Sequence, residues 1–506
     1  MIVLKSATFN SIEGRIIDIE ISITKGIPSF DIVGLPNIEI RESRERVRSA
    51  ILNSGFKFPL GRITVNLSPA NLKKEGSLLD LCIAIGILMA SKQIFPRKNI
   101  SDKIILGELS LDGHVKNIKG TIPILIDGFK NGFKEFVLPK DNFSESNFVK
   151  DVNVDYFDNL KEVVNYIRSG EINSKLKCVD KYLDKEIKFI NFEDVLGHIS
   201  SKRALQIAAA GFHNVILYGP VGSGKTMLAK SLRSVLPNLD YEESLEKGRV
   251  YSLISVNEDL NKPTFREIHH TISKSSFIGN ERNGKVGEIT LSNNGVLFLD
   301  EMLEFKREML EVLRKIIEER KIILNRNKNF LEYPAKFMLV GAMNLCPCGN
   351  YLNNNAIKQC TCETVKRERY INKLSNSLLD RIDIFTYTPV IDYIDISHSK
   401  DTRMTTKQAL NKISEARKIQ KDRFKKFNIK YNSEMNNDLI NRFCELSKSS
   451  KEILETIYRK ESISTRSYFK ILKIARTIAD LDGEIKINDS HIVEVMNYRK
   501  FIKKVV

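Results

Sequence analysis

The stretch NVILYGPVGSGKTMLAKSL, residues 214–232, decides the fold of the central part of this chain. Its first five residues are mostly apolar and β-branched, which is typical of a buried strand, and the residues after Thr226 follow a helical pattern. The glycine-rich turn between them has the spacing GxxxxGK[ST], which forms a phosphate-binding loop when a strand precedes it and a helix follows. The turn consists of Gly219, Pro220, Val221, Gly222, Ser223, Gly224, Lys225 and Thr226.

This loop predicts a site for a nucleotide. Glycines allow backbone N–H groups to approach phosphate, and Lys225 supplies positive charge to the β and γ phosphates. The hydroxyl of Thr226 is a ligand for Mg²⁺. The sequence therefore predicts that the chain binds ATP together with Mg²⁺.

A second apolar run, VLFL at residues 296–299, ends in two acids, Asp300 and Glu301. At the end of a strand beside a P-loop, Asp300 would hold Mg²⁺ and Glu301 would polarise the attacking water. The alternative is a buried strand followed by the acidic start of a helix, where carboxylates are favourable in any case. The P-loop favours hydrolysis over this alternative.

Three further polar residues follow in the order that AAA+ ATPases use. Asn344 ends the strand-like run KFMLVGAMN, in the place of a residue that senses the γ-phosphate. Arg381, in LLDRID, resembles an arginine finger, and Arg466, near a helix start capped by Ser464 or Thr465, resembles a sensor-2 arginine. Alone, Asn344 would be a turn residue and each arginine a surface ion pair. If Arg381 acts on a neighbouring subunit, the working form is an oligomer, and a closed ring is expected.

The local pattern of apolar and polar residues divides the chain into four segments and predicts a multidomain α/β fold. Residues 1–169 alternate short β-like runs with helical patterns, and residues 170–188 are polar and predict a linker. Residues 189–395 alternate apolar strands with amphipathic helices, which predicts a parallel sheet covered on both faces. The clearest of these predicted helices runs from Glu304 to Arg320, with apolar residues at helical spacing. Residues 396–506 are helical throughout and predict a small lid domain.

Composition limits the class of protein. A chain of 506 residues is too long for one hydrophobic core, and its net charge of +17 favours a polyanionic partner such as nucleic acid. The competing explanation is genome base composition, which also enriches lysine. The N-terminus lacks an export signal. The apolar run 78–90 is shorter than the roughly 20 residues that span a bilayer, so it predicts a buried helix instead. We expect a cytoplasmic protein without a membrane partner.

Four of the seven cysteines form two paired CxC elements. In a reducing compartment they are not expected to form disulfides. Four thiolates from two short elements could make a closed tetrahedral zinc site. A CxC pair, however, has one residue fewer than CxxC between the two thiolates that must bind the same ion. The alternative is a loop of reduced cysteines. The four are Cys346, Cys348, Cys360 and Cys362.

Beyond these sites, long motifs resemble the YifB/ComM family of magnesium-chelatase-like AAA+ proteins. They include VNLSPANLKKEGSLLDLCIAIGIL at 65–88, GEITLSNNGVLFLDEMLEF at 287–305 and STRSYFKILKIARTIADL at 464–481. The resemblance implies a hexameric, ATP-driven DNA motor, described for ComM-type members as a branch-migration helicase in recombination and natural transformation. A chelatase-type motor that remodels a protein partner is the alternative.

The resemblance also points to DNA contacts in two loops. Residues 322–337 read as a β-hairpin whose tip would carry Arg326 and Lys328 toward a central pore. The inserted segment 269–289 would be a second loop, with Arg282 and Lys285 available for phosphate. Ordinary solvated loops are the alternative. We expect branched or single-stranded DNA as the partner.

The run KKEGSLLD, residues 73–80, resembles the nucleophile loop of Lon-type peptidases. The peptidase serine falls at Leu78, with Ser77 one residue off, and the peptidase lysine falls at Ile124. A catalytic dyad needs an activatable hydroxyl and a base within hydrogen-bond reach. We therefore expect a Lon-type α+β fold that has no peptidase activity and serves for DNA binding or assembly.

Overall fold

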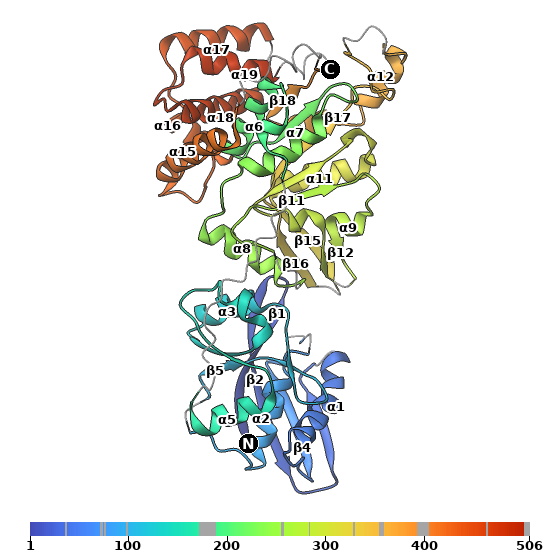
Figure 1. Cartoon of the computed structure of the whole chain (residues 1–506), viewed down its shortest axis with the longest axis vertical. Coiled ribbons are helices and arrows are strands. Elements are labelled where there is room, and N and C mark those ends of the chain that lie inside the picture. Colours follow the sequence, from blue (N-terminus) through green and yellow to red (C-terminus); the bar gives the residue numbers. More distant parts are fainter. Residues whose placement is uncertain are drawn as a thin grey trace. The chain divides into compact units, whose positions relative to one another are not determined.

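The computed structural model describes residues 1–35, 38–70, 74, 77–97, 100–171, 189–254, 258–282, 284–326, 329–353, 359–391, 404–461 and 464–499 (Figure 1). The chain divides into two compact units. Unit 1 comprises Met1–Leu183 and Asp240–Leu260, and unit 2 comprises Asp184–Leu239 and Asn261–Val506. Most of the predicted linker, residues 172–188, lies outside the described residues.

Unit 1 is built on a seven-stranded mixed sheet with the order β3-β4-β2-β1-β5-β8-β9. The long strands β1 and β2 pair antiparallel, as do β2 and β4, and the remaining neighbours are parallel. Alternation sets the inner face, because Ile17, Ile19 and Ile21 of β2 are fully buried. The strands are β1 (Ile2–Asn10), β2 (Glu13–Thr24), β3 (Ser29–Val33), β4 (Arg62–Ser68), β5 (Lys103–Ile105), β8 (Glu135–Pro139) and β9 (Asn153–Phe157).

The apolar run near residue 80 forms the buried helix that the sequence predicts. This helix, α2 (Asp80–Ala90), is apolar on all sides and buried from Asp80 to Leu88. Leu78, just before it, and Ile124, in α3 (Thr121–Lys130), are both buried apolar side chains, at the two positions that the resemblance to Lon-type peptidases assigns to the dyad. The other long helices of unit 1 are α1 (Ile38–Asn53) and α5 (Leu160–Ser169).

One helix of unit 1 comes from the middle of the chain. The helix α8 (Tyr241–Tyr251) begins with a capping box between Asp240 and Glu243. Its Arg249 binds Asp127 of α3 with an N–O distance of 2.7 Å, and this ion pair joins residues 122 positions apart. The contact with unit 1 leaves no local signal in the sequence, because the two partners are far apart along the chain.

Unit 2 contains the predicted parallel sheet, with the order β11-β14-β17-β10-β18. All neighbouring strands pair in parallel, and β14 and β17 are buried at every residue. Continuous apolar runs are required here because helices cover both faces of such a sheet. The strands are β10 (Val215–Tyr218), β11 (Phe265–Ile268), β14 (Val296–Leu299), β17 (Met338–Met343) and β18 (Ile384–Tyr387).

The amphipathic helix that the sequence predicts from Glu304 begins later. A 3-10 turn, η4 (Met302–Glu304), follows β14, and the backbone is extended at Lys306 before α11 (Arg307–Glu319) starts. Met309, Leu313 and Ile316 are buried as their spacing predicts. The predicted hairpin is confirmed as β15 (Lys321–Arg326) paired antiparallel with β16 (Asn329–Pro334).

The C-terminal part of unit 2 is helical, as predicted. It packs α18 (Thr465–Asp482) against α6 (Ile199–Gly211) and α15 (Thr406–Phe424), so the helical part and the sheet share one core. The remaining helices there are α16 (Asn437–Phe443), α17 (Lys448–Glu461) and α19 (Asp489–Arg499). Within the described parts of the chain, no helix combines the length and apolar character needed to cross a membrane.

Candidate nucleotide-binding site

The predicted P-loop connects β10 to α7 (Lys225–Ser231) in unit 2. Its turn uses left-handed backbone at Gly222 and Gly224, with φ of 79° and 80°, which side chains other than glycine rarely adopt. The Lys225 ammonium lies inside the loop and donates to the carbonyls of Gly219, at 2.9 Å, and Pro220, at 2.6 Å. Burial lowers the pKa of Lys225 to about 8, and the charge of Asp300 partly opposes that shift.

The two residues predicted to hold Mg²⁺ are in contact. The Thr226 hydroxyl donates to Asp300 Oδ2 at a distance of 2.9 Å. They meet because β10 and β14 end at the same edge of the sheet, with β17 between them. A hydroxyl and a carboxylate oxygen are the hard ligands that Mg²⁺ prefers, so this pair fits the ion.

Glu301 follows Asp300 in a left-handed backbone conformation, with φ of 48°. Its side chain is 54% exposed, and Glu301 Oε2 lies 3.4 Å from Nδ1 of His270. The carboxylate is thus turned toward solvent at the sheet edge where the P-loop also lies. Because water reaches it there, Glu301 is placed to polarise a nucleophilic water.

The contact between His270 and Glu301 was not predicted from the sequence. His269 and His270 follow β11 directly, and their rings lie 4.2 Å apart. Nitrogen atoms of both histidines and a carboxylate oxygen of Glu301 lie within 4.8 Å of one another. A signal existed, since a polar pair after a parallel strand belongs to the same sheet edge as Asp300.

Asn344 lies where the sequence predicts it, directly after β17 and between the ends of β10 and β14. It is half-buried. The preceding residue, Met343, accepts a hydrogen bond from the Gly219 amide at 3.3 Å. The P-loop, the two acids and Asn344 therefore come together at one sheet edge.

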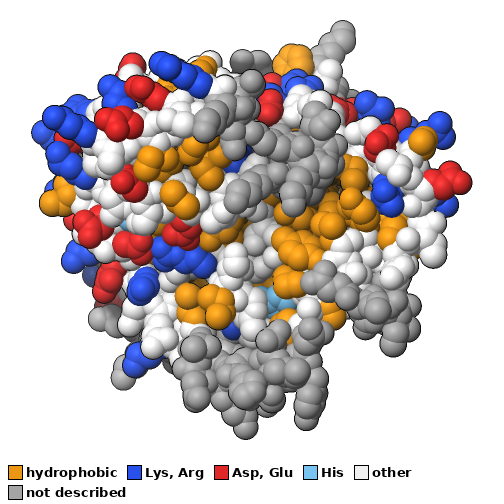
Figure 2. Space-filling model, turned by 90° about the horizontal axis from the view of Figure 1, so that it is seen from above, with side chains coloured by type: hydrophobic (Ala, Val, Ile, Leu, Met, Phe, Trp, Pro, Cys, Tyr) orange, Lys and Arg blue, Asp and Glu red, His pale blue; other side chains and the backbone are white. Residues whose placement is uncertain are grey.

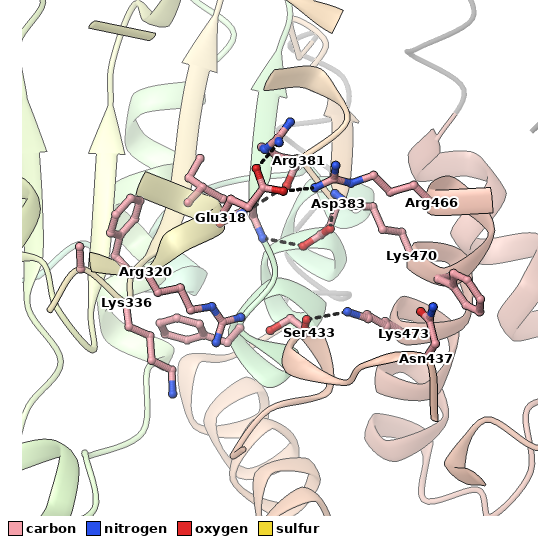
Figure 3. A pocket seen from close by; sticks show the side chains of 16 residues that line it. Glu318, Arg320, Lys336, Arg381, Asp383, Ser433, Asn437, Arg466, Lys470 and Lys473 are labelled. Carbon is pink, nitrogen blue, oxygen red and sulfur yellow. Dashed lines mark hydrogen bonds and ion pairs between the residues drawn. The ribbon is translucent and has the colours of Figure 1, made fainter. Parts of the chain in front are cut away.

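The two predicted arginines meet at a separate pocket, between α11 and α18 (Figure 3). Arg381 donates to the Glu318 carboxylate, and Nη2 of Arg466 lies 3.8 Å from Oε1 of the same group. The hydrogen bond from Arg381 lowers the pKa of Glu318. Among the described residues, those that line this pocket include none from the P-loop, so one chain does not bring either arginine to its own nucleotide site.

The pocket is rich in positive charge. Lys470 and Lys473 of α18 lie in it, and Lys470 Nζ binds Asp383 Oδ1 at 2.8 Å (Figure 3). Although burial opposes ionisation, Lys470 and His213 hold the pKa of Asp383 far below its usual range. Arg381 is 9% exposed, and its buried Nε has no hydrogen-bond partner among the described residues. The pocket therefore has the character of an anion receptor.

The four clustered cysteines are brought together in unit 2. Sγ of Cys348 lies 3.3 Å from that of Cys346 and 3.6 Å from that of Cys360, and the Sγ atoms of Cys360 and Cys346 are 3.7 Å apart. Cys362 completes a group whose sulfurs all lie within 4.8 Å of one another. Burial opposes ionisation of Cys348, but N–H groups and the Cys346 thiol outweigh it and lower its pKa to about 6. The cluster is compatible with structural zinc, whose ligands are thiolates.

The predicted DNA loops are described in part. The inserted segment contains α9 (Lys274–Ile278) and a short hairpin of β12 (Gly279–Asn280) and β13 (Lys285–Val286), on which Arg282 and Lys285 are exposed. Arg326 ends β15, but its side chain and all of Lys328 lie outside the described residues. Figure 2 shows the molecule from above, on the side of the C-terminal helices and not of these loops, and on the left of that face basic side chains lie among acidic ones.

Comparisons with known proteins agree along the chain. The family model "Magnesium chelatase, subunit ChlI" matches residues 191–396, "Subunit ChlI of Mg-chelatase" matches 19–142, and "Magnesium chelatase, subunit ChlI C-terminal" matches 403–499. The competence protein ComM of Haemophilus influenzae is 36% identical, over 97% of this chain and 96% of its own. The YifB protein of Escherichia coli is 37% identical, over 96% and 94%.

The chain belongs to the YifB/ComM family of magnesium-chelatase-like proteins. The parallel sheet and the helical C-terminal part agree with the AAA+ fold of this family. Membership of the family implies ATPase activity, with ATP and Mg²⁺ as the ligands of the P-loop site. The similarity to both relatives includes both units, because the two alignments extend over nearly the whole chain.

Proposed function

We propose that this YifB/ComM protein is an ATP-driven DNA motor that works as a hexameric ring and moves branch points in recombination or DNA-uptake intermediates. The observation that carries the proposal is the separation of two half-sites within one chain. The P-loop, Asp300, Glu301 and Asn344 share a sheet edge, whereas Arg381 and Arg466 share a pocket that contains no described P-loop residue. The Haemophilus relative is named a competence protein, and this name supports DNA as the substrate.

In the proposed reaction, Lys225 and the loop N–H groups bind the β and γ phosphates, and Thr226 and Asp300 hold Mg²⁺. Bound Mg²⁺ neutralises charge that develops on the phosphate oxygens. Glu301 polarises a water whose oxygen attacks the γ-phosphorus as the bond to the β–γ bridging oxygen breaks. Asn344 orients that water or the γ-phosphate.

A second subunit would complete the site. Arg381 and Arg466 would leave Glu318 and bind the γ-phosphate held by the neighbouring P-loop. The unpartnered Nε of Arg381 gives this exchange a donor that Glu318 does not use. Hydrolysis would then depend on assembly, as expected for a ring.

DNA would be held by the loops of unit 2, with unit 1 as a platform. Arg282 and Lys285 beside β12 and β13, together with Arg326 and Lys328 at the β15–β16 hairpin, would contact the phosphate backbone without reading sequence. We propose that unit 1 keeps a Lon-type fold without peptidase chemistry. The buried Leu78 and Ile124 at the dyad positions support this proposal.

A zinc ion bound by Cys346, Cys348, Cys360 and Cys362 is also part of the proposal. Four sulfurs at the usual Zn–S distance of about 2.3 Å from a tetrahedral ion lie about 3.8 Å apart. Two of the observed separations, 3.6 Å and 3.7 Å, agree with this geometry. Its role would be structural, because four protein ligands leave no position for substrate.

The second candidate function is a chelatase-type motor that remodels a protein partner, favoured by the three family models. One experiment separates the two: ATP hydrolysis and strand displacement measured together on a synthetic four-way junction. A DNA motor resolves the junction with ATP, and Lys225→Ala and Glu301→Gln both abolish resolution. Hydrolysis that is indifferent to DNA would contradict the proposal and favour the chelatase-type function.

A further inference from the structure

The turn that carries the first two cysteines lies against the P-loop. The Val221 amide donates to the carbonyl of Gly349 at 2.8 Å, and Val221 is one of the residues that form the phosphate-binding turn. Gly349 has a left-handed φ of 76°, and a Cβ on it would lie 2.1 Å from Cγ2 of Val221. Only glycine fits this contact, so the turn packs closely against Val221 of the P-loop.

The geometry of this turn depends on its cysteines. Gly349 directly follows Cys348, and its amide donates to the carbonyl of Cys346 at 3.0 Å. The Tyr351 amide donates to Sγ of Cys346 at 3.3 Å. The turn with the carbonyl that accepts from Val221 is therefore held in place by residues of the proposed zinc site.

The second pair of cysteines leads to the segment that follows Glu301. Cys362 lies two residues before α12 (Thr364–Ile371), and its carbonyl accepts from Arg367 of that helix at 3.0 Å. Tyr370 of α12 donates to Glu304 at 2.6 Å, and Lys373 donates to the carbonyl of Leu303 at 2.8 Å. Both acceptors lie in η4, which directly follows Glu301.

We propose that zinc on the four cysteines acts as a clamp that joins the P-loop to the segment after Glu301, so that nucleotide affinity depends on the bound metal. This inference rests on the zinc site of the proposed function and is independent of DNA. The metal fixes two turns that are separate in sequence: the first contacts Val221 of the P-loop, and the second leads into α12, whose Tyr370 contacts Glu304 three residues after Glu301. Without it, the Gly349 carbonyl loses its fixed position and the phosphate-binding amides lose their preorganisation.

The test measures metal content and nucleotide affinity in the full-length protein. Zinc is quantified in the purified protein, removed stepwise with an organomercurial and a chelator, and restored with zinc chloride. At each step the dissociation constant for a fluorescent, non-hydrolysable ATP analogue is measured with Mg²⁺ present. We expect about tenfold weaker binding or more in the metal-free protein, and recovery with zinc.

Two variants separate the clamp from general folding. Cys348→Ser removes a ligand, so it should lose both zinc and affinity, whereas Cys444→Ser, a buried cysteine outside the cluster, should keep both. Gly349→Ala keeps all four ligands but clashes with Val221, so it should keep zinc and bind the analogue more weakly. If Cys348→Ser does not fold, Gly349→Ala still tests whether the contact between this turn and the P-loop supports nucleotide affinity.

The outcomes are distinct. Purified protein that holds no zinc, and does not take it up, overturns the metal site together with the clamp. Protein that holds zinc, but binds the analogue equally well without it, overturns the clamp and leaves the structural zinc. Neither result bears on whether the motor moves DNA, which the junction experiment measures separately.

Discussion

At the scale of single residues, the proposed reaction assigns Glu301 to the chemical step and Lys225 to the binding of phosphate. Lys225 is held inside the P-loop by two carbonyls, which a phosphate oxygen would replace as its partners. Glu301 is exposed beside His270 and makes no described contact with the loop. Changes at the two positions should therefore affect different steps.

We expect Glu301→Gln to lower the rate of hydrolysis by about 10²- to 10⁴-fold, because the amide cannot polarise water as a base does. The affinity for the ATP analogue should change by less than about twofold, since the carboxylate is not needed for binding. Single-turnover hydrolysis and fluorescence titration measure the two quantities. Glu308→Gln, on the exposed start of α11, is the matched control. Equal losses of rate and affinity in Glu301→Gln would contradict its assignment to the water.

At the same scale, Glu318 contacts both Arg381 and Arg466, so in the proposed ring its carboxylate would compete with phosphate for these arginines. Glu318→Gln keeps an acceptor for Arg381 but removes the competing charge. Hydrolysis should then reach its half-maximal rate at a lower protein concentration, because the arginines are available to a neighbour's nucleotide. The concentration dependence of the ATPase rate measures this. A shift to higher concentration would show that Glu318 positions the arginines instead of competing for them.

At the scale of elements, the buried pair of Asp383 and Lys470 joins the end of the parallel sheet to α18. Asp383 lies just before β18, and its carboxylate is also 3.4 Å from the ring of His213. Removal of one partner leaves the other charge buried without compensation. This contact is therefore central to the attachment of the helical part.

We expect Asp383→Asn to lower the free energy of unfolding by about 3 kcal/mol or more at pH 7. The pKa of Asp383 is depressed in the folded state, so its contribution is complete above the ordinary aspartate pKa and is lost as the pH falls below it. Urea denaturation between pH 3 and 7 should show a steeper loss of stability toward acid in the wild type than in the variant. Equal slopes would mean that other carboxylates carry the acid sensitivity.

The elements also show what the sequence could and could not predict. The strands β10, β14 and β17 and the P-loop were predictable, because apolar runs and turn residues act within a few positions of themselves. The start of α11 was predicted too early, since the 3-10 turn at Met302–Glu304 has the same apolar spacing as a helix. The contacts of Glu318 with Arg381 and of Glu301 with His270 escaped prediction, because they join residues 63 and 31 positions apart through tertiary packing.

At the scale of the whole molecule, the separation of the two half-sites of unit 2 bears on how the subunits assemble. Within one chain, the described residues that line the arginine pocket include none from the P-loop. If subunits are arranged head to tail, each P-loop meets the pocket of the next chain, and a closed ring leaves no half-site unused. A motor built in this way hydrolyses ATP only at its interfaces.

Mixing two inactive variants tests this arrangement. Lys225→Ala removes the P-loop lysine but keeps Arg381, and Arg381→Ala keeps the P-loop, so each variant alone should lack hydrolysis. In rings assembled from equal amounts of both, about a quarter of the interfaces pair an intact P-loop with an intact Arg381, and a corresponding share of wild-type activity should return. If Arg381 acted within its own chain, no subunit in the mixture would hold both groups. The mixture would then stay inactive at every ratio, with native mass spectrometry confirming that the two variants had exchanged.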